Sequence, residues 1–402
     1  MKYTLLAPRP KEQCAELRPV YELPVWYQLP LSYHCDSTIE FLNHISRTIM
    51  QDKECRGHSE LVALAFWLRA SNLVEFVKDS PPGHYKALGT VVHFTPSNVD
   101  TMFVYSWACS VLAGNNNVVR VSERGGLVKE HLIRILNQVF ALPQFYEFAI
   151  RNLFVTYEYQ ASQGKSITHA LCKQADARIL WGGDNSVSTI RAIPCPPRCR
   201  DISFADRYSF SVIGSEVMVD MEIAEGAMTN LMKELTPYNQ QACSSPKVLF
   251  WIGDSRSLEK FLSLAGERHF EVLPSLTRRN EQLVTAQSLQ IEYAASRVHM
   301  VGELCAIEMT KVNDKMLSLH SGNQVLFCQC VASLDEIAPF ISPKVQTLSF
   351  AGIAKPALVK FMAKPSITGV DRAVPLGEAL SFSPVWDGYE LFSQLSRRVV
   401  IR

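Results

Sequence analysis

The sequence has almost no net charge, because its 402 residues include 40 Lys and Arg and 39 Asp and Glu side chains. A nucleic-acid partner is therefore not expected, because nonspecific binding to a polyanion needs a basic surface. No apolar run approaches the roughly 18 residues of a membrane-spanning helix, and the start at Met1-Lys2-Tyr3-Thr4 has no signal-peptide core. These absences predict a cytoplasmic protein without a membrane span.

Several common catalytic motifs are also missing. Neither GxGxxG nor GxxxxGK(S/T) occurs, so the usual Rossmann fingerprint and the P-loop are absent. HExxH and GxSxG are absent too, which leaves metalloprotease and α/β-hydrolase functions without support. The 11 cysteines are odd in number and scattered, a pattern that favours reduced thiols over a disulfide framework. Cys195 with Cys199, and Cys328 with Cys330, lack partners at zinc-ribbon spacing, so no metal site is expected.

The sequence does contain short β-branched runs that alternate with helical patterns from residue 89 onward. The runs are Gly89 to Phe94, Asn117 to Val121, Leu153 to Tyr157, Ala177 to Trp181 and Ile202 to Phe204. This alternation predicts stacked βαβ units, and therefore an α/β fold with an open, doubly wound parallel sheet. A helix is expected from Met102 to Val111, with Asn98 or Ser97 as its N-cap and Gly114 at its end.

The rest of the chain predicts helices and strands on either side of this sheet. Before it, the patterns indicate a strand near Trp26 to Leu29, helices around Ser37 to Met50 and Leu61 to Val77, and a break at Pro81-Pro82-Gly83. After it, they indicate a helix from Val219 to Leu235, a strand from Lys247 to Ile252 and a helix from Leu258 to Gly266. A length of 402 residues favours at least two domains. We expect residues 1–206 to form the N-terminal and dinucleotide-binding domain and 207–376 a second α/β domain, with 377–402 returning to the first.

Three segments of the predicted sheet follow strand ends, where open α/β sheets bind ligands. Thr95-Pro96-Ser97-Asn98 follows the first strand, and Asn98 has two interpretations, an amide donor to a developing oxyanion or a plain N-cap. Arg120, Ser122, Glu123 and Arg124 follow the second strand, where they suit a dinucleotide ribose or form a solvated charge cluster. Gly182-Gly183 permits close backbone approach to a pyrophosphate, or simply forms a tight turn.

Cys243 is the candidate nucleophile. It lies between a polar run and Pro246, directly before the apolar segment Val248 to Ile252, so it stands at the entrance of a predicted strand. A buried structural role is the alternative, because cysteine is among the most buried residue types.

Taken together, these motifs resemble the acyl-CoA reductase family of the aldehyde dehydrogenase superfamily. The resemblance runs from about residue 89 to residue 397, and it rests on the order of its segments along the chain. The segments are 95–98, Gly114 to Arg120, Trp181 to Asp184, Phe204 to Arg207, Gln241 to Pro246, Gly369 to Arg372 and Trp386 to Tyr389.

The resemblance implies a cofactor domain and a catalytic domain, with NADPH or alternatively NADH as the reductant. It implies that Cys243 attacks an acyl-CoA or other acyl thioester and that Asn98 helps form the oxyanion hole. It further implies that Thr95, Pro96, Ser97, Arg120, Ser122, Glu123, Arg124, Gly182 and Gly183 contact the cofactor. An acyl-activating synthetase partner and a homo-oligomer are also expected. The alternatives are an aldehyde dehydrogenase working in the oxidative direction and a catalytically silent scaffold.

One departure from the superfamily concerns the base that activates water. Ordinary aldehyde dehydrogenases have a Glu-Leu-Gly-Gly motif, whereas Ile202-Ser203-Phe204-Ala205-Asp206 contains no Glu. Hydrolysis of an acyl-enzyme is therefore not expected, and reduction to an aldehyde is favoured.

Overall fold

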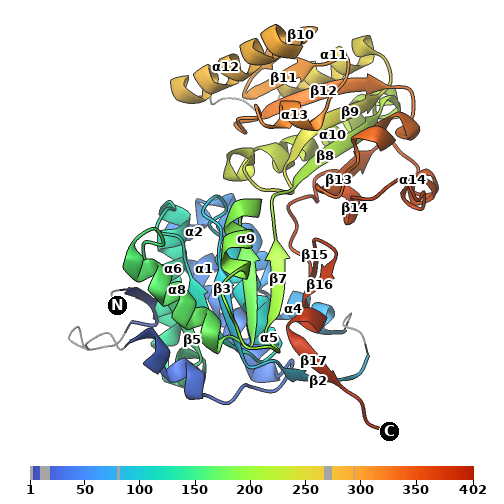
Figure 1. Cartoon of the computed structure of the whole chain (residues 1–402). Helices are drawn as coiled ribbons and strands as arrows, with labels where there is room; N and C mark the ends of the chain where they lie inside the picture. Colours follow the sequence, from blue (N-terminus) through green and yellow to red (C-terminus); the bar gives the residue numbers. More distant parts are fainter. Residues whose placement is uncertain (1–2, 10–18, 79–81, 267–273, 294) are drawn as a thin grey trace. The chain divides into compact units, whose positions relative to one another are not determined.

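The computed structural model describes residues 3–9, 19–78, 82–266, 274–293 and 295–402. They form two compact units, unit 1 within residues 1–206 and 382–402 and unit 2 within residues 207–381 (Figure 1). Each unit is built on its own α/β sheet. Residue 81 of the expected break lies outside the described residues.

Unit 1 contains a six-stranded sheet in the order β1-β5-β4-β3-β6-β7. The strands of this sheet are β1 (Thr4–Ala7), β3 (Thr90–Phe94), β4 (Asn116–Arg120), β5 (Asn152–Thr156), β6 (Ala177–Trp181) and β7 (Arg200–Phe204). Two further strand pairs of unit 1 are β2 (His84–Ala87) with β17 (Ser396–Val399), and β15 (Val385–Trp386) with β16 (Tyr389–Glu390). Its helices are α1 (Asp36–Gln51), α2 (Lys53–Arg56), α3 (Ser59–Trp67), α4 (Ala70–Lys78), α5 (Met102–Leu112), α6 (Leu127–Phe140), α7 (Tyr146–Ala149), α8 (Ser162–Gln174), α9 (Asp184–Arg191) and α15 (Leu391–Gln394). Short 3-10 turns are η1 (Val20–Glu22), η2 (Pro24–Tyr27) and η3 (Pro143–Phe145).

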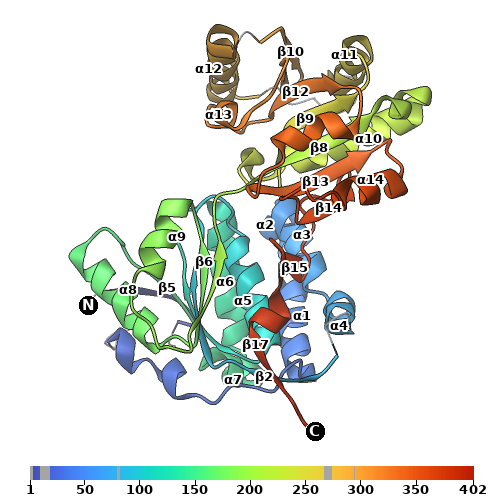
Figure 2. The same cartoon turned by 45° about the vertical axis from the view of Figure 1, so that its right-hand side comes forward.

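The sheet of unit 1 is parallel from β5 to β7, and β1 is an antiparallel edge strand on β5. Figure 2 shows α8 and α9 on one face of this sheet and α5 and α6 on the other, with α1 beyond them. Helices on both faces bury most residues of the central strands β3, β4, β5 and β6, which explains the apolar runs in their sequences. The predicted α/β class with a doubly wound parallel sheet is confirmed.

Two predictions for the first residues of the chain are wrong. The expected strand near Trp26 is the 3-10 turn η2, which begins at Pro24 and is held by a hydrogen bond from Trp26 Nε1 to the Val20 carbonyl oxygen (2.7 Å). The expected single helix from Leu61 to Val77 is two helices, α3 and α4. The backbone N–H of Ala70, where α4 begins, donates to Asn43 Oδ1 (3.0 Å) instead of continuing the helix.

Unit 2 contains a seven-stranded sheet in the order β10-β11-β12-β9-β8-β13-β14. Its strands are β8 (Tyr208–Gly214), β9 (Pro246–Ile252), β10 (Arg297–Val301), β11 (Leu304–Glu308), β12 (Val325–Val331), β13 (Val345–Ala351) and β14 (Arg372–Pro375). Its helices are α10 (Met221–Leu235), α11 (Ser255–Ser263), α12 (Leu276–Tyr293), α13 (Asp314–Leu317) and α14 (Lys355–Met362), and its 3-10 turns are η4 (Ser215–Val219), η5 (Pro237–Gln240), η6 (Leu264–Gly266) and η7 (Leu334–Phe340). The sheet is parallel except at its edge strand β10.

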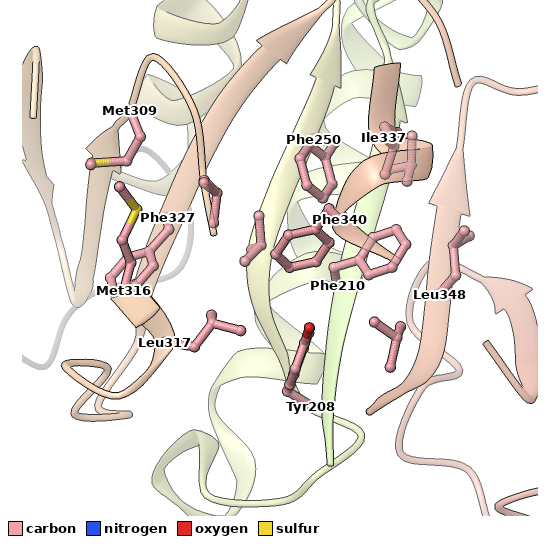
Figure 3. Packing of buried hydrophobic residues seen from close by; sticks show 14 of the residues in the cluster. Tyr208, Phe210, Phe250, Met309, Met316, Leu317, Phe327, Ile337, Phe340 and Leu348 are labelled. Atoms are coloured by element: carbon pink, nitrogen blue, oxygen red, sulfur yellow. The ribbon is translucent and has the colours of Figure 1, made fainter. Parts of the chain in front are cut away.

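The core of unit 2 lies on both faces of this sheet. On one face Phe210, Phe250 and Phe340 pack edge to face, with ring centroids 5.0–5.7 Å apart (Figure 3). On the other face α10 and α11 pack on Leu249 and Trp251. Edge-to-face pairs of this kind stabilise a core by roughly 0.5–1.5 kcal/mol beyond their buried area. These strands are therefore rigid supports for the loops at their ends.

His93 makes the stability of unit 1 depend on pH. Its imidazole is fully buried on β3, with Nδ1 3.2 Å from Ser106 Oγ and Nε2 3.0 Å from Asn117 Oδ1. Burial lowers the pKa of His93 from 6.5 to about 4. A pKa that is lower in the folded than in the unfolded state stabilises the fold above about pH 6.5. We expect this contribution to fall by up to about 1.4 kcal/mol per pH unit between pH 6.5 and 4.

Urea unfolding at pH 7.5, 6.0 and 5.0 measures this dependence. His93→Gln should be less stable than the wild type at pH 7.5 but should lose less stability on acidification. The exposed His84, replaced by Gln, serves as the control and should keep the wild-type slope. An equal slope in His93→Gln and wild type would contradict the prediction.

Candidate functional site

The carboxyl edge of the unit 1 sheet carries the predicted cofactor segments. The chain runs outward from β3 through β4 to β5 and then returns to place β6 on the other side of β3. The order of connection therefore reverses between β3 and β6, which is where open α/β sheets bind ligands. The segments after β3, β4 and β6 all leave the sheet at this edge.

The segment after β3 is tied to the end of β4. Thr95 is buried, and both its backbone N–H and its Oγ1 donate to the Arg120 carbonyl oxygen (3.2 and 3.0 Å). Pro96 is half-buried, whereas Ser97 and Asn98 are exposed. Thr101, not Asn98 or Ser97, is the N-cap of α5, so the capping interpretation is wrong. The predicted helix end is confirmed, because Gly114 follows the C-cap of α5 with a φ of +86°.

The segment after β4 borders a cavity of about 830 Å³. Ser122 and Glu123 line it, together with Arg9, Lys129, Arg134 and Asn137. The Lys129 ammonium donates to the carbonyl oxygens of residues 122, 123 and 124 (3.3, 3.0 and 3.2 Å), so it fixes this loop.

Two predicted cations of this segment lie elsewhere. Arg120 donates to the Tyr157 carbonyl oxygen (3.3 Å) and lies 5.5 Å from the centre of the Tyr157 ring. Neither Arg120 nor Arg124 is among the lining residues of the cavity. Lys129 was missed by the sequence analysis because it belongs to the first turn of a helix with no motif around it.

The segment after β6 is the turn at Gly182 and Gly183. The Gly182 N–H donates to the Phe204 carbonyl oxygen at the end of β7 (3.1 Å). Gly183 is the N-cap of α9, and a Cβ added to it would meet no atom within 4 Å, so open space lies beside the turn. Asp184 begins the helix and turns a carboxylate oxygen toward the Asp206 N–H (3.1 Å). The turn thus offers accessible backbone N–H groups at a helix N-terminus, a common setting for phosphate binding.

In unit 2, Cys243 lies in a turn directly before β9. Its side chain is half-buried, unlike the buried thiols of Cys305 and Cys328 in the same unit. Its carbonyl oxygen accepts a hydrogen bond from Ser209 Oγ on β8 (2.7 Å), and Ser209 Oγ also accepts one from the Thr347 N–H on β13 (3.1 Å). The backbone of the cysteine is therefore bound to β8 through Ser209, which is itself bonded to β13.

The residues that precede Cys243 form a strained, well-anchored turn. Tyr238, Asn239 and Gln240 have φ values of 54°, 51° and 61°, a conformation that costs non-glycine residues energy and often occurs at functional sites. Gln240 is completely buried, and its Nε2 donates to the carbonyl oxygens of Pro246 and Val325 (2.7 Å each). Gln240 and Ser209, which the sequence analysis did not identify, thus fix the position of the Cys243 turn.

Among the described residues, no group of three or more His, Cys, Asp and Glu side chains is arranged to hold a metal ion. Within the same described ranges, no helix is both long and apolar enough to cross a lipid bilayer.

Solved structures with a similar fold are aldehyde dehydrogenases and related proteins. Lactaldehyde dehydrogenase of Escherichia coli matches 95% of this chain and 87% of its own with a TM-score of 0.62 at 12% identity. PnpE of Pseudomonas sp. WBC-3 matches 94% of this chain and 86% of its own with a TM-score of 0.64 at 15% identity. At such low identity these structures speak for the fold alone, and they confirm the aldehyde dehydrogenase-like architecture.

Sequence relatives and a family model identify the family of this chain within that fold. The long-chain acyl-protein thioester reductase of Aliivibrio fischeri is 24% identical over 304 residues, which cover 72% of this chain and 58% of that protein. The long-chain acyl-protein thioester reductase 2 of Photobacterium leiognathi is 25% identical over 202 residues, 47% of this chain and 40% of that protein. The chain thus spans well under two thirds of the length of either relative. The model of the acyl-CoA reductase (LuxC) family matches residues 69–398. The predicted family is confirmed: the chain belongs to the acyl-CoA reductase (LuxC) family.

Proposed function

We propose that this protein reduces a long-chain fatty acyl thioester, either acyl-CoA or an acyl-protein, to the fatty aldehyde through an acyl-Cys243 intermediate. The observation that carries the proposal is the fixed, half-buried Cys243 at the entrance of β9 in a member of this family. The names of the two curated relatives support the class of substrate and the direction of the reaction.

In the proposed reaction the Cys243 thiolate attacks the thioester carbonyl. The C–S bond to the donor breaks, the donor thiol leaves with a proton, and a new thioester on Cys243 remains. The Asn98 amide donates a hydrogen bond to the oxyanion of each tetrahedral intermediate, an interaction typically worth about 2.7–4 kcal/mol. After hydride addition, collapse of the thiohemiacetal on Cys243 releases the aldehyde and regenerates the thiolate.

The reductant of the proposed reaction is NADPH, or alternatively NADH, which supplies the hydride when bound. Unit 1 would bind it, and three features support this fit: the reversal of strand order between β3 and β6, the open space beside Gly183, and the cavity bordered by Ser122 and Glu123. Residues 95–97 would border the cofactor, Gly182 and Gly183 would bind its phosphates, and Ser122 and Glu123 would hold the adenosine ribose. Lys129 would keep the ribose loop in position and add positive charge for a 2′-phosphate.

The end of β7 supports reduction rather than hydrolysis in this proposal. The strand closes with the buried phenyl ring of Phe204, which cannot accept a proton from water. An acyl-enzyme without a nearby base reacts slowly with water, so it survives until hydride arrives. Acyl transfer from an acyl-activating synthetase and assembly into a homo-oligomer are further parts of this proposal.

A pulse-chase experiment tests the proposal. The protein is incubated with radiolabelled long-chain acyl-CoA without nucleotide, separated from unbound label, and then given NADPH, NADH or buffer alone. We expect label on the protein, release as aldehyde with NADPH, and little free acid in buffer. Rapid release of acid in buffer would indicate a hydrolytic aldehyde dehydrogenase. No label at all, from acyl-CoA or from an acyl-protein donor, would indicate a catalytically silent scaffold.

A further inference from the structure

Three aromatic side chains, Trp181, Phe204 and Tyr389, are in contact at the carboxyl ends of β6 and β7 in unit 1. We call them the aromatic ladder. Trp181 is the last residue of β6 and Phe204 the last of β7, and the two are partners in the strand register. Their rings stack with centroids 3.8 Å apart and planes 13° from parallel. Tyr389 of β16 packs edge-on against Phe204, with centroids 5.6 Å apart. Phe204 therefore supports one face of the Trp181 indole, and Tyr389 supports Phe204 in turn.

The ladder borders the point where the strand order reverses. Leu180 and Phe94 are register partners on β6 and β3, so Trp181 and Thr95 are the next residues along these neighbouring strands. Trp181 also directly precedes the Gly182-Gly183 turn. Trp181 thus lies next to both segments that the proposed function assigns to the cofactor.

Exposure distinguishes the members of the ladder. Phe204 is buried, with 3% of its surface accessible, whereas Trp181 is only half-buried and retains accessible surface. Open space lies beside the adjacent Gly183, where an added Cβ would meet no atom within 4 Å. A flat ring that is held on one side, on a residue that keeps part of its surface accessible, can stack with a planar ligand at little cost in side-chain entropy.

We propose that Trp181, supported by Phe204 and Tyr389, is the stacking platform for the nicotinamide ring of the cofactor. This inference rests on the proposed function, since it requires that unit 1 binds a nicotinamide nucleotide. The indole face attracts cations more strongly than neutral rings. The oxidised nicotinamide ring is positively charged and the reduced ring is neutral, so the platform binds the oxidised form more strongly. Phe204 and Tyr389 are positioning residues, because they act through the indole.

A ladder that only fills the end of the sheet makes different predictions. In that case loss of the indole would change the stability of unit 1 and would affect every nucleotide ligand equally. A platform for the nicotinamide ring discriminates between ligands with and without this ring. Ligand selectivity therefore separates the two roles.

The test compares the affinities of Trp181→Leu and wild type for NADP⁺, NADPH and adenosine 2′,5′-bisphosphate, which lacks nicotinamide. We expect affinity for NADP⁺ to fall by about 3- to 10-fold, as for a lost aromatic stack. Affinity for NADPH should fall less, and that for the bisphosphate should not change. Trp26→Leu is the matched control: it removes another half-buried indole of unit 1, from η2 before the sheet, and should leave all three affinities unchanged.

Equal affinities of Trp181→Leu and wild type for all three ligands, or the same loss for all three, would overturn the inference. If Trp181→Leu does not fold, Trp181→Phe takes its place. Its phenyl ring should retain most of the affinity for NADP⁺ but lose the quenching of indole fluorescence that the nucleotide causes, and unchanged quenching would overturn the inference. A wild-type protein that binds neither NADP⁺ nor NADPH would overturn the proposed function, and this inference with it.

Discussion

Replacing Cys243 by Ser is expected to abolish acyl-enzyme formation and to reduce the rate of aldehyde production by roughly 10⁴-fold or more, the usual effect of removing a catalytic nucleophile. A serine hydroxyl is similar in size, but it ionises at a far higher pH than a thiol and is a much weaker nucleophile without a partner base. The turn itself should persist, because its anchors include the Cys243 carbonyl oxygen and the Gln240 side chain, which the substitution leaves unchanged. Single-turnover reduction of labelled acyl-CoA measures the rate, and gel analysis of bound label measures the intermediate.

Cys330→Ser is the matched control for this prediction. Cys330 is also a half-buried thiol of unit 2, but it lies near the end of β12, away from the entrance of β9 in the strand register. It should keep the labelling and the activity of the wild type. Labelling of Cys243→Ser at the wild-type rate would show that another residue carries the acyl group. Aldehyde production without labelling in the wild type would exclude the covalent intermediate.

The strands of the unit 1 sheet could be predicted because each can be recognised from its own local sequence. β3 to β7 are short β-branched runs covered by helices on both faces, so each appears in the sequence as an apolar segment bounded by turn residues. The predicted runs agree with the observed strands to within two residues. The order of the strands, β1-β5-β4-β3-β6-β7, comes from the structure, because the sequence pattern does not say which strands are neighbours.

The wrong predictions concern segments whose structure depends on distant residues. The 3-10 turn η2 near Trp26 is followed by Gln28, whose carbonyl oxygen accepts a hydrogen bond from the Asn116 amide on β4 (2.7 Å), a contact that no local pattern encodes. α3 and α4 are separate because Asn43 of α1 binds the Ala70 N–H. The antiparallel edge strand β1 depends on pairing with β5, about 150 residues away in the sequence.

The candidate site shows the same division between local and distant information. Cys243, Asn98 and Gly182 could be proposed from the sequence because each lies next to a predicted strand, Asn98 and Gly182 after one and Cys243 before one. Gln240 could not, because its role depends on a hydrogen bond to Val325, 85 residues further along the chain. Lys129 could not be identified from the sequence either, because only the folded loop brings three carbonyl oxygens to its ammonium group.

Replacing Asn98 by Ala is expected to lower the turnover number by about 10²- to 10³-fold, which is the usual effect of removing one oxyanion donor. The Michaelis constant for the thioester should change little, because a ground-state carbonyl gains less from the donor than the oxyanion does. Asn98→Asp should lose more activity than Asn98→Ala, since it replaces the N–H donor with a negative charge beside the developing oxyanion. Stability should be nearly unchanged, because Asn98 is exposed and does not cap α5.

Asn280→Ala controls for the loss of an exposed amide, because Asn280 lies on the surface of α12 in unit 2. Steady-state kinetics over a range of acyl-CoA concentrations separate the two constants, and rapid quenching of the labelling reaction reports on acylation alone. A turnover number of Asn98→Ala within twofold of the wild type would exclude Asn98 as an oxyanion donor. A loss confined to the Michaelis constant would assign it to ground-state binding instead. Slower acylation and slower reduction together are the signature of a donor to the oxyanion, because both steps pass through a tetrahedral intermediate on the same sulfur.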